Sequence, residues 1–271
     1  MPQAKKYLPA NICIYCGEND IRLLTEEHII PYSLGGFLKL PKSSCRKCAS
    51  ITRGITETIS RTMYGHVRIR LNAPTRNKNQ RPKHLKLNLK SPNGSTREIK
   101  IPAELWPRTY PVLHLKEATV LSKVQQSEFK VEILVDQRDI DFLYRYGYVS
   151  LHETIHITHA FEAKAFCRQL AQIGHAFAAA EIGLDAFQPW LVPLIMDQSK
   201  EMGNELLFIG NASPHEALSS KIALDVVKSH GVSFIVCRFT MPDLGWRFPT
   251  YQIVCGTVAD DRFDGLSMQI A

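Results

Sequence analysis

Four cysteines near the N-terminus form two pairs with the same spacing, Cys13-x2-Cys16 and Cys45-x2-Cys48. Thiolates are soft ligands, and four of them complete the tetrahedral coordination of a structural Zn²⁺. The two pairs are separated by 28 residues. This spacing predicts a zinc ion that closes a loop of fixed size, so that the metal shapes a site rather than being the reactive centre.

The loop between the two cysteine pairs places a carboxylate directly before an imidazole, as Glu27 and His28. An imidazole that titrates near neutral pH is suited to take a proton from water. A carboxylate oxygen is a ligand for a hard divalent cation such as Mg²⁺. Hydrolysis of a phosphodiester needs an activated water and a cation on the developing negative charge, which predicts His28 as general base and Glu27 as a metal ligand.

The elements that must position these residues follow from the pattern around them. Residues 23–30 read as a short strand, which has to end before Pro31 because proline donates no ladder hydrogen bond. A Gly-Gly turn leads to a second short strand at residues 37–40. A helix is expected from about residue 46 to residue 62. The sequence therefore predicts a small ββα unit with metal at its base.

Taken together, these motifs resemble the HNH endonuclease family in its zinc-stapled branch. The resemblance rests on residues 11–62 and on the order Cys-x2-Cys, Glu-His-Ile-Ile-Pro, Gly-Gly, Cys-x2-Cys and a following helix. It implies a ββα-metal fold, single-metal hydrolysis of DNA, and a catalytic Mg²⁺ or Mn²⁺ besides the structural zinc. It also implies that His28 is the general base and that Glu27 binds the catalytic metal.

The chain departs from the family pattern at two places. Ala49 stands after the last cysteine, where many relatives have a metal-binding His or Asn, and residues 40–44 contain no Asn. Substitutes are expected on the helix, with Glu57 ranked first and Thr52 second as catalytic residues. The alternative for Glu57 is a surface acid paired with a helical arginine four residues away.

Positive charge is concentrated in the first third of the chain. Residues 1–90 hold 17 Lys and Arg against 5 Asp and Glu, a net charge of +12, whereas the remaining residues have a net charge of −5. Such a split indicates a polyanionic partner, here DNA, for the N-terminal third. The alternative is a solvated basic surface. The residues expected to contact phosphate groups are Arg68, Arg70, Arg76, Arg81 and Lys83.

The fold class that these patterns favour is α+β, with an N-terminal zinc-stapled ββα-metal module and a larger mixed α/β C-terminal domain. We expect the module at residues 1–65, a basic arm and hairpin at 66–110, and a mixed domain of unknown role at 111–271. The hairpin is expected from strands 85–89 and 97–101 around the turn Ser91-Pro92-Asn93-Gly94-Ser95. The C-terminal domain is open to a homodimer or to a regulatory partner.

Three elements of the C-terminal domain can be read from periodicity. Apolar residues at helical spacing predict a long helix over residues 161–182, and Gly183 is placed to end it. Two apolar runs, at residues 232–237 and 251–255, read as buried strands.

A second metal motif competes with the first. His152-Glu153-Thr154-Ile155-His156 has the H-E-x-x-H pattern of zinc metalloproteases, which requires a helix so that both histidines share one face. The β-branched residues in and after this segment favour a strand instead. We therefore expect a strand with histidines on its wetter face.

Composition bounds the class of protein. The chain has 271 residues and 45% hydrophobic residues, with no apolar run of the length that spans a bilayer and no secretory signal after Met1. Seven cysteines, an odd number, suit a reducing cytoplasm. We expect a cytoplasmic protein of prokaryotic origin, and by analogy a role in defence or in a mobile element.

The sequence thus predicts a metal-dependent endonuclease that hydrolyses DNA phosphodiester bonds. The alternative is a zinc-ribbon-like protein that binds nucleic acid without catalysis, which Ala49 and the missing Asn motivate.

Overall fold

The computed structural model describes residues 5–75, 78–126, 128–198, 202–212, 221–241, 248–258 and 267–270. Its mixture of helices and strands confirms the α+β class. The chain divides into two compact units, and both are discontinuous in sequence. Unit 1 consists of Met1–Glu57, Leu113–Lys130 and Ala163–Ala271, and unit 2 of Thr58–Val112 and Val131–Glu162.

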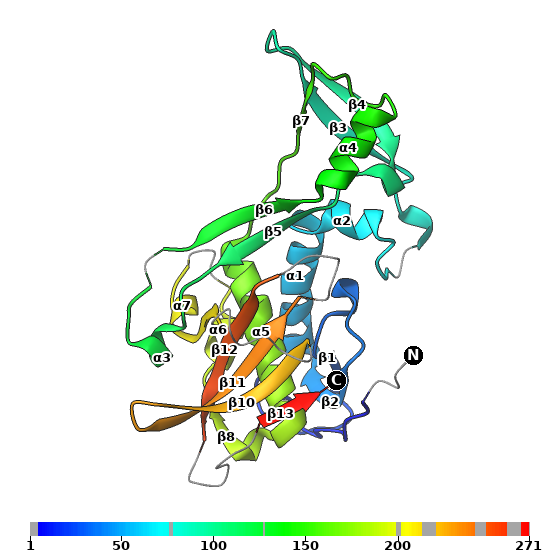
Figure 1. Ribbon diagram of the computed structural model, residues 1–271. Helices are drawn as coiled ribbons and strands as arrows, with labels where there is room; N and C mark the ends of the chain where they lie inside the picture. Colours follow the sequence, from blue (N-terminus) through cyan, green and yellow to red (C-terminus); the bar gives the residue numbers. More distant parts are fainter. Residues whose placement is uncertain are drawn as a thin grey trace. The chain divides into compact units, whose positions relative to one another are not determined.

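The N-terminal module of unit 1 has the predicted strand–turn–strand–helix order (Figure 1). Strand β1 (Leu24–His28) pairs antiparallel with β2 (Lys39–Cys45), and α1 (Arg46–Thr62) follows β2 without a break. Between the strands lies a short 3-10 turn, η1 (Tyr32–Leu34), which begins after Pro31.

A six-stranded antiparallel sheet forms the larger part of unit 1 (Figure 1). Its strands are β8 (Phe187–Pro189), β9 (Ile209–Asn211), β10 (Ile222–Ser229), β11 (Val232–Thr240), β12 (Thr250–Val258) and β13 (Ser267–Ile270). They lie in the order β13-β10-β11-β12-β8, and β9 also pairs with β12. The tight β10–β11 turn uses His230 and Gly231, both with positive φ, which matches the twist of a two-residue hairpin. The predicted strands at 232–237 and 251–255 are confirmed within β11 and β12.

Helix α5 (Ala163–Ile182) runs along one face of this sheet and confirms the predicted long helix (Figure 1). Gly174 sits at the contact, where an added Cβ would lie 2.6 Å from Ile253 Cγ2 and 3.3 Å from Cys255 Sγ. A glycine at this position therefore lets the helix backbone approach β12 closely. The helix ends at Gly183, whose φ of 78° suits only glycine well.

Unit 2 is built on a three-stranded sheet in the order β4-β3-β7. The hairpin of β3 (His84–Lys90) and β4 (Thr96–Pro102) confirms the predicted one, and β7 (Thr154–His156) adds to β3. Alternate residues of β3 are buried, so Leu85, Leu87 and Leu89 pack with Trp106 and Leu143 in one hydrophobic cluster. The helices of unit 2 are α2 (Gly65–Arg70) and α4 (Gln137–Arg145).

Strands β5 (Thr109–His114) and β6 (Lys130–Val135) form a two-stranded ladder and contain two of the boundaries between the units. The remaining short helices are α3 (Thr119–Ser122), α6 (Val192–Met196), α7 (Glu205–Phe208), η2 (Lys78–Gln80), η3 (Ala103–Leu105) and η4 (Leu184–Ala186). Among the described residues, no helix combines the length and the apolar character needed to cross a membrane.

Candidate functional site

The four N-terminal cysteines converge on one point. Their Sγ atoms all lie within 4.8 Å of one another, and the Sγ atoms of Cys16 and Cys45 are 3.7 Å apart. Zn–S bonds of about 2.3 Å at tetrahedral angles place sulfur atoms about 3.8 Å apart. The donor set and its spacing therefore fit a structural zinc ion.

Local backbone geometry holds these sulfurs in place. In the first knuckle, Cys13 N–H donates to Glu18 O (2.7 Å) and Gly17 N–H donates to Cys13 O (2.9 Å). Cys45 ends β2 and donates its backbone N–H to Cys13 Sγ (3.4 Å), while Cys48 lies in the first turn of α1. The second knuckle is thus a strand-to-helix junction.

Burial, and then the neighbouring thiols, raise the pKa of Cys48 well above its usual range. Four thiolates packed this closely repel one another, and a Zn²⁺ ion supplies the compensating charge.

His28 ends β1 opposite Lys39 of β2, and its side chain is half-buried. Its ring centroid lies 6.1 Å from that of Tyr32, which is itself exposed. The ammonium group of Lys39 bonds to Glu26 Oε1 at 2.6 Å. An imidazole in this place is accessible to water, as a general base must be.

The loop after β1 depends on a close backbone approach at Gly36. A Cβ on this residue would lie 2.0 Å from the carbonyl oxygen of Ile30. The loop is closed by hydrogen bonds from Ile29 N–H to Leu38 O (3.0 Å) and from Gly36 N–H to Pro31 O (3.1 Å). The glycine therefore fixes the path of the chain directly after His28.

Glu27 lies on the opposite face of β1 from His28 and is 5% exposed. Its Oε1 atom accepts hydrogen bonds from Tyr15 Oη (3.2 Å) and Gln172 Nε2 (2.7 Å). Burial raises the pKa of Glu27 to about 7, against the lowering effect of these hydrogen bonds. The carboxyl group is therefore buried and hydrogen-bonded to donors of the protein itself.

The hydrogen bond to Gln172 is one link in a buried polar chain. Gln172 Oε1 accepts from Gln169 Nε2 (3.1 Å), and Gln169 Oε1 accepts from Thr56 Oγ1 (2.8 Å). The chain connects β1, α5 and α1. Sequence reasoning missed Tyr15, Gln169 and Gln172. The available signals were an aromatic hydroxyl inside a cysteine knuckle and two amides within an apolar helix.

Comparison with known families bears on this region. The family model for HNH endonucleases matches residues 13–62, from the first cysteine of the zinc cluster to the end of α1. The expected resemblance to HNH endonucleases is thus confirmed for residues 13–62. The searches of curated proteins and of solved structures found no match. We call this segment the HNH module below.

A catalytic metal site is a separate question from the zinc cluster. Within the described part of the chain, the four cysteines are the one group of three or more metal-ligating side chains that come together. Thr52 is buried beside Glu27, and its hydroxyl lowers the pKa of that carboxyl. Glu57 is exposed, and five residues of α1 turn it about 140° around the helix axis from Thr52. The HNH module brings Thr52, but not Glu57, to Glu27.

Mg²⁺ prefers carboxylate oxygens and keeps several of its waters. Glu27 is enclosed and already hydrogen-bonded, and Glu57 belongs to the solvent face of α1. These two residues do not fit a shared Mg²⁺ or Mn²⁺ site.

Helix α5 also supports the first zinc knuckle directly. His175 is fully buried, and its Nε2 donates to the carbonyl oxygen of Ile14 at 2.7 Å. Its ring centroid lies 5.6 Å from that of Tyr15. Burial lowers the pKa of His175 to about 4, so the ring is neutral at pH 7. The HNH module is thus backed by a helix that lies more than a hundred residues away in sequence.

Three of the five predicted phosphate-binding residues hold the backbone of unit 2. Arg68 donates to Ser60 O and Pro74 O (both 3.2 Å), Arg70 donates to Trp106 O (3.1 Å), and Arg81 donates to Asn72 and to Ala73 O. Lys83 is exposed. Arg76 lies outside the described residues.

The H-E-x-x-H segment does not form the helix that a metalloprotease needs. Its residues 154–156 are strand β7, as expected, and His152 and His156 are exposed. Glu153 binds Arg97 through two hydrogen bonds of 2.5 and 2.7 Å, and Arg97 lowers the pKa of that carboxyl to about 2. This acid is an ion-pair partner rather than a base.

Proposed function

We propose that the protein is an endonuclease that hydrolyses phosphodiester bonds of DNA, with His28 as the general base. The observation that supports this most is the place of His28. It is a half-buried imidazole at the end of β1, in a loop closed by four cysteines, inside a segment of the HNH family.

The residues around His28 have distinct roles in this proposal. His28 takes a proton from the attacking water, and the zinc bound by the cysteines fixes the two ends of the hairpin loop. Glu27 orients β1 through its bonds to Tyr15 and Gln172, and Thr52 completes its surroundings. Gly36 allows the turn that follows the strand.

Dependence on Mg²⁺ or Mn²⁺ enters the proposal through the family alone. Such a cation supplies charge stabilisation at the phosphate when bound. Glu27 and Glu57 do not fit a shared site for this cation. Neither residue is therefore assigned a role as a ligand of a catalytic metal.

The wider setting is also proposed. DNA contacts fall to unit 2, where Lys83 is exposed and Arg68, Arg70 and Arg81 lie within a basic segment. A cytoplasmic location, a role in bacterial defence and a partner for the C-terminal part of the chain are expectations from composition and analogy.

The test is incubation of supercoiled plasmid with zinc-loaded protein, in the presence of Mg²⁺, of Mn²⁺ or of no added divalent cation. We expect nicked or linear product only when a divalent cation is added. Cleavage that is equal in all three conditions would contradict metal dependence.

A second candidate function is a zinc-ribbon-like module that binds DNA without cleaving it. Ala49 at the position of a usual metal ligand and the enclosure of Glu27 favour it. It predicts retarded plasmid with no nicking under any of the three conditions, which is the opposite of the outcome expected for the endonuclease.

A further inference from the structure

One face of the β3–β4 hairpin in unit 2 is exposed and basic. Because strand residues alternate between faces, the apolar residues of β3 enter the hydrophobic cluster while the intervening residues face solvent. We define the basic face of the hairpin as His84, Lys86 and Lys90 of β3 together with Lys100 of β4, all of which are exposed. None of these residues belongs to the HNH module.

The strand register places two of these charges side by side. Lys86 lies directly opposite Lys100 in the antiparallel pair. Like charges at directly opposed positions destabilise a sheet. Glu98 offsets part of this repulsion through a 2.9 Å ion pair with Lys86. It is the one acid of residues 83–102, which contain five Lys and Arg, so the hairpin keeps a net charge of +4.

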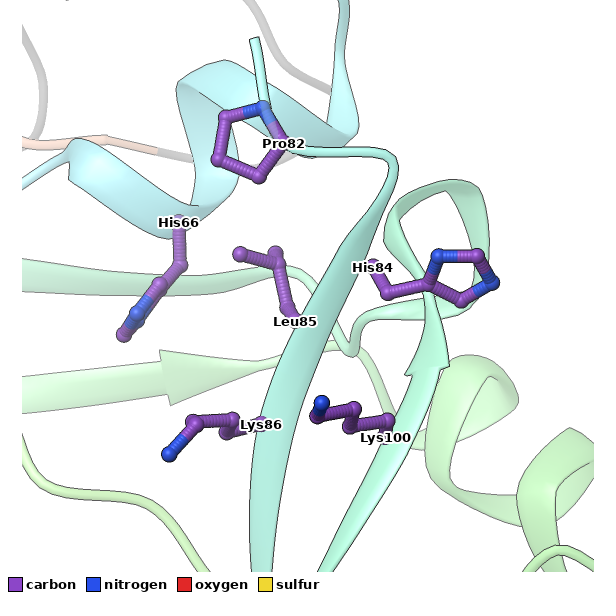
Figure 2. Close-up of a pocket in the computed structure, with 6 residues that line it drawn as sticks. All are labelled: His66, Pro82, His84, Leu85, Lys86 and Lys100. Atoms are coloured by element: carbon purple, nitrogen blue, oxygen red, sulfur yellow. The ribbon is translucent and has the colours of Figure 1, made fainter.

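Three of these four side chains, those of His84, Lys86 and Lys100, line an open depression of about 640 Å³. Figure 2 shows its lining: His66 from α2, Pro82 from the preceding segment, His84, Leu85 and Lys86 from β3, and Lys100 from β4. The ring of His66 is held at 4.5 Å from that of Trp106. The depression therefore presents two ammonium groups and two imidazole rings to one volume of solvent.

We propose that this basic face binds the phosphodiester backbone of DNA, an inference that rests on the proposed function. The charges continue along the strand, since Lys90 lies about 13 Å from Lys86 at a rise of about 3.3 Å per residue. A row of exposed lysines suits a polymer of regularly spaced anions better than a small anion, which needs an enclosed set of donors. Contacts of this kind position DNA without reading its sequence.

The test is the affinity of the full-length, zinc-loaded protein for a short labelled DNA duplex, measured by fluorescence anisotropy over a series of KCl concentrations without divalent cation. The variant is K86Q/K100Q, and the matched control is K130Q, which removes an exposed lysine from unit 1. Each lost phosphate contact lowers the steepness of log Kd against log salt by about 0.9, so the double variant should lose about 1.8 while the control matches wild type.

A second variant, K90Q, guards against a folding defect at the opposed pair, and it should lower the slope by about 0.9. Thermal melting and zinc content confirm that the variants fold. Wild-type slope and affinity in both hairpin variants would overturn the inference, and plasmid nicking by wild type would then leave the proposed function standing. Absence of DNA binding by wild type would overturn the inference, and with absence of nicking it would overturn the proposed function too. The same variants are also tested for binding to anionic lipid vesicles. Weaker binding to the vesicles with unchanged affinity for DNA would likewise overturn the inference.

Discussion

At the scale of residues, Glu27 and His28 are neighbours in sequence with opposite surroundings. Successive residues of a strand point to opposite faces, so β1 turns His28 toward water and Glu27 into the interior. The imidazole is half-buried at the end of the strand, while the carboxyl group bonds to Tyr15 and Gln172 and so fixes the strand. Under the proposed function, only His28 of this pair meets the reacting atoms, and Glu27 positions the strand that carries it.

Two glycines of the HNH module should respond oppositely to the same substitution. Gly36→Ala places a Cβ against the carbonyl of Ile30 and should lower the free energy of unfolding by at least about 1 kcal/mol. Gly54→Ala adds a Cβ into open space on α1 and should raise it by about 0.5–1 kcal/mol. Urea denaturation of the zinc-loaded proteins measures both, and changes of the same sign would contradict the loop geometry.

His175 should make stability depend on pH below neutrality. Its folded pKa of about 4 lies below the ordinary value of 6.5, so the unfolded chain binds more protons between these values. Stability from the neutral ring is therefore present above pH 6.5 and is lost as the pH falls toward 4, by about 1.4 kcal/mol per pH unit.

The matched variant for this prediction is His175→Gln, which keeps an N–H donor for Ile14 O and removes the titration. As the pH falls from 6.5 to 4, the unfolding free energy of wild type should decrease more than that of the variant. Parallel pH profiles for the two zinc-loaded proteins would show that His175 does not titrate in this way.

At the scale of elements, α5 is the helix that organises unit 1. One side packs on β12 through Gly174, and another bonds to the zinc knuckle and to β1 through His175 and Gln172. The HNH module therefore shares its support with the six-stranded sheet. Its stability should depend on residues that no motif of the module contains.

Gln172→Ala tests this dependence. The substitution removes the Gln172 donor to the buried Glu27 Oε1 and the Gln172 acceptor of Gln169 Nε2, and should cost about 1–3 kcal/mol of unfolding free energy. Gln188→Ala, which alters an exposed glutamine of β8, is the control and should change little. Equal effects of the two substitutions in urea denaturation would contradict a role for the buried polar chain.

Elements with strong local signals were predictable from sequence. The β1–β2–α1 order, the β3–β4 hairpin and α5 follow from alternation, turn residues and helical period. Strands β8 and β9, of three residues each, were not, because their pairing with β12 is set by tertiary contacts rather than by a pattern of their own. The enclosure of Glu27 was missed for the same reason, since Gln172 lies 145 residues away.

At the scale of the whole molecule, the chain crosses between its two units several times. Three of these crossings fall inside an element, so that α1, β5 and β6 each have some residues in one unit and some in the other. Each unit therefore combines segments that are remote in sequence. Composition and charge suggested three consecutive parts, because they report what a segment contains and not where the chain returns. The zinc cluster was predictable in full, since its four ligands come from two local knuckles.

The central proposal is that His28 is the base of a zinc-stapled nuclease. Its most direct test is the plasmid-nicking rate of His28→Ala, with zinc content and DNA affinity determined on the same sample. We expect the rate to fall at least about 100-fold while zinc content and DNA affinity stay at wild-type values. His156→Ala, which changes an exposed histidine of β7, should nick at the wild-type rate. Nicking by His28→Ala at the wild-type rate, or a loss of zinc together with activity, would contradict the account.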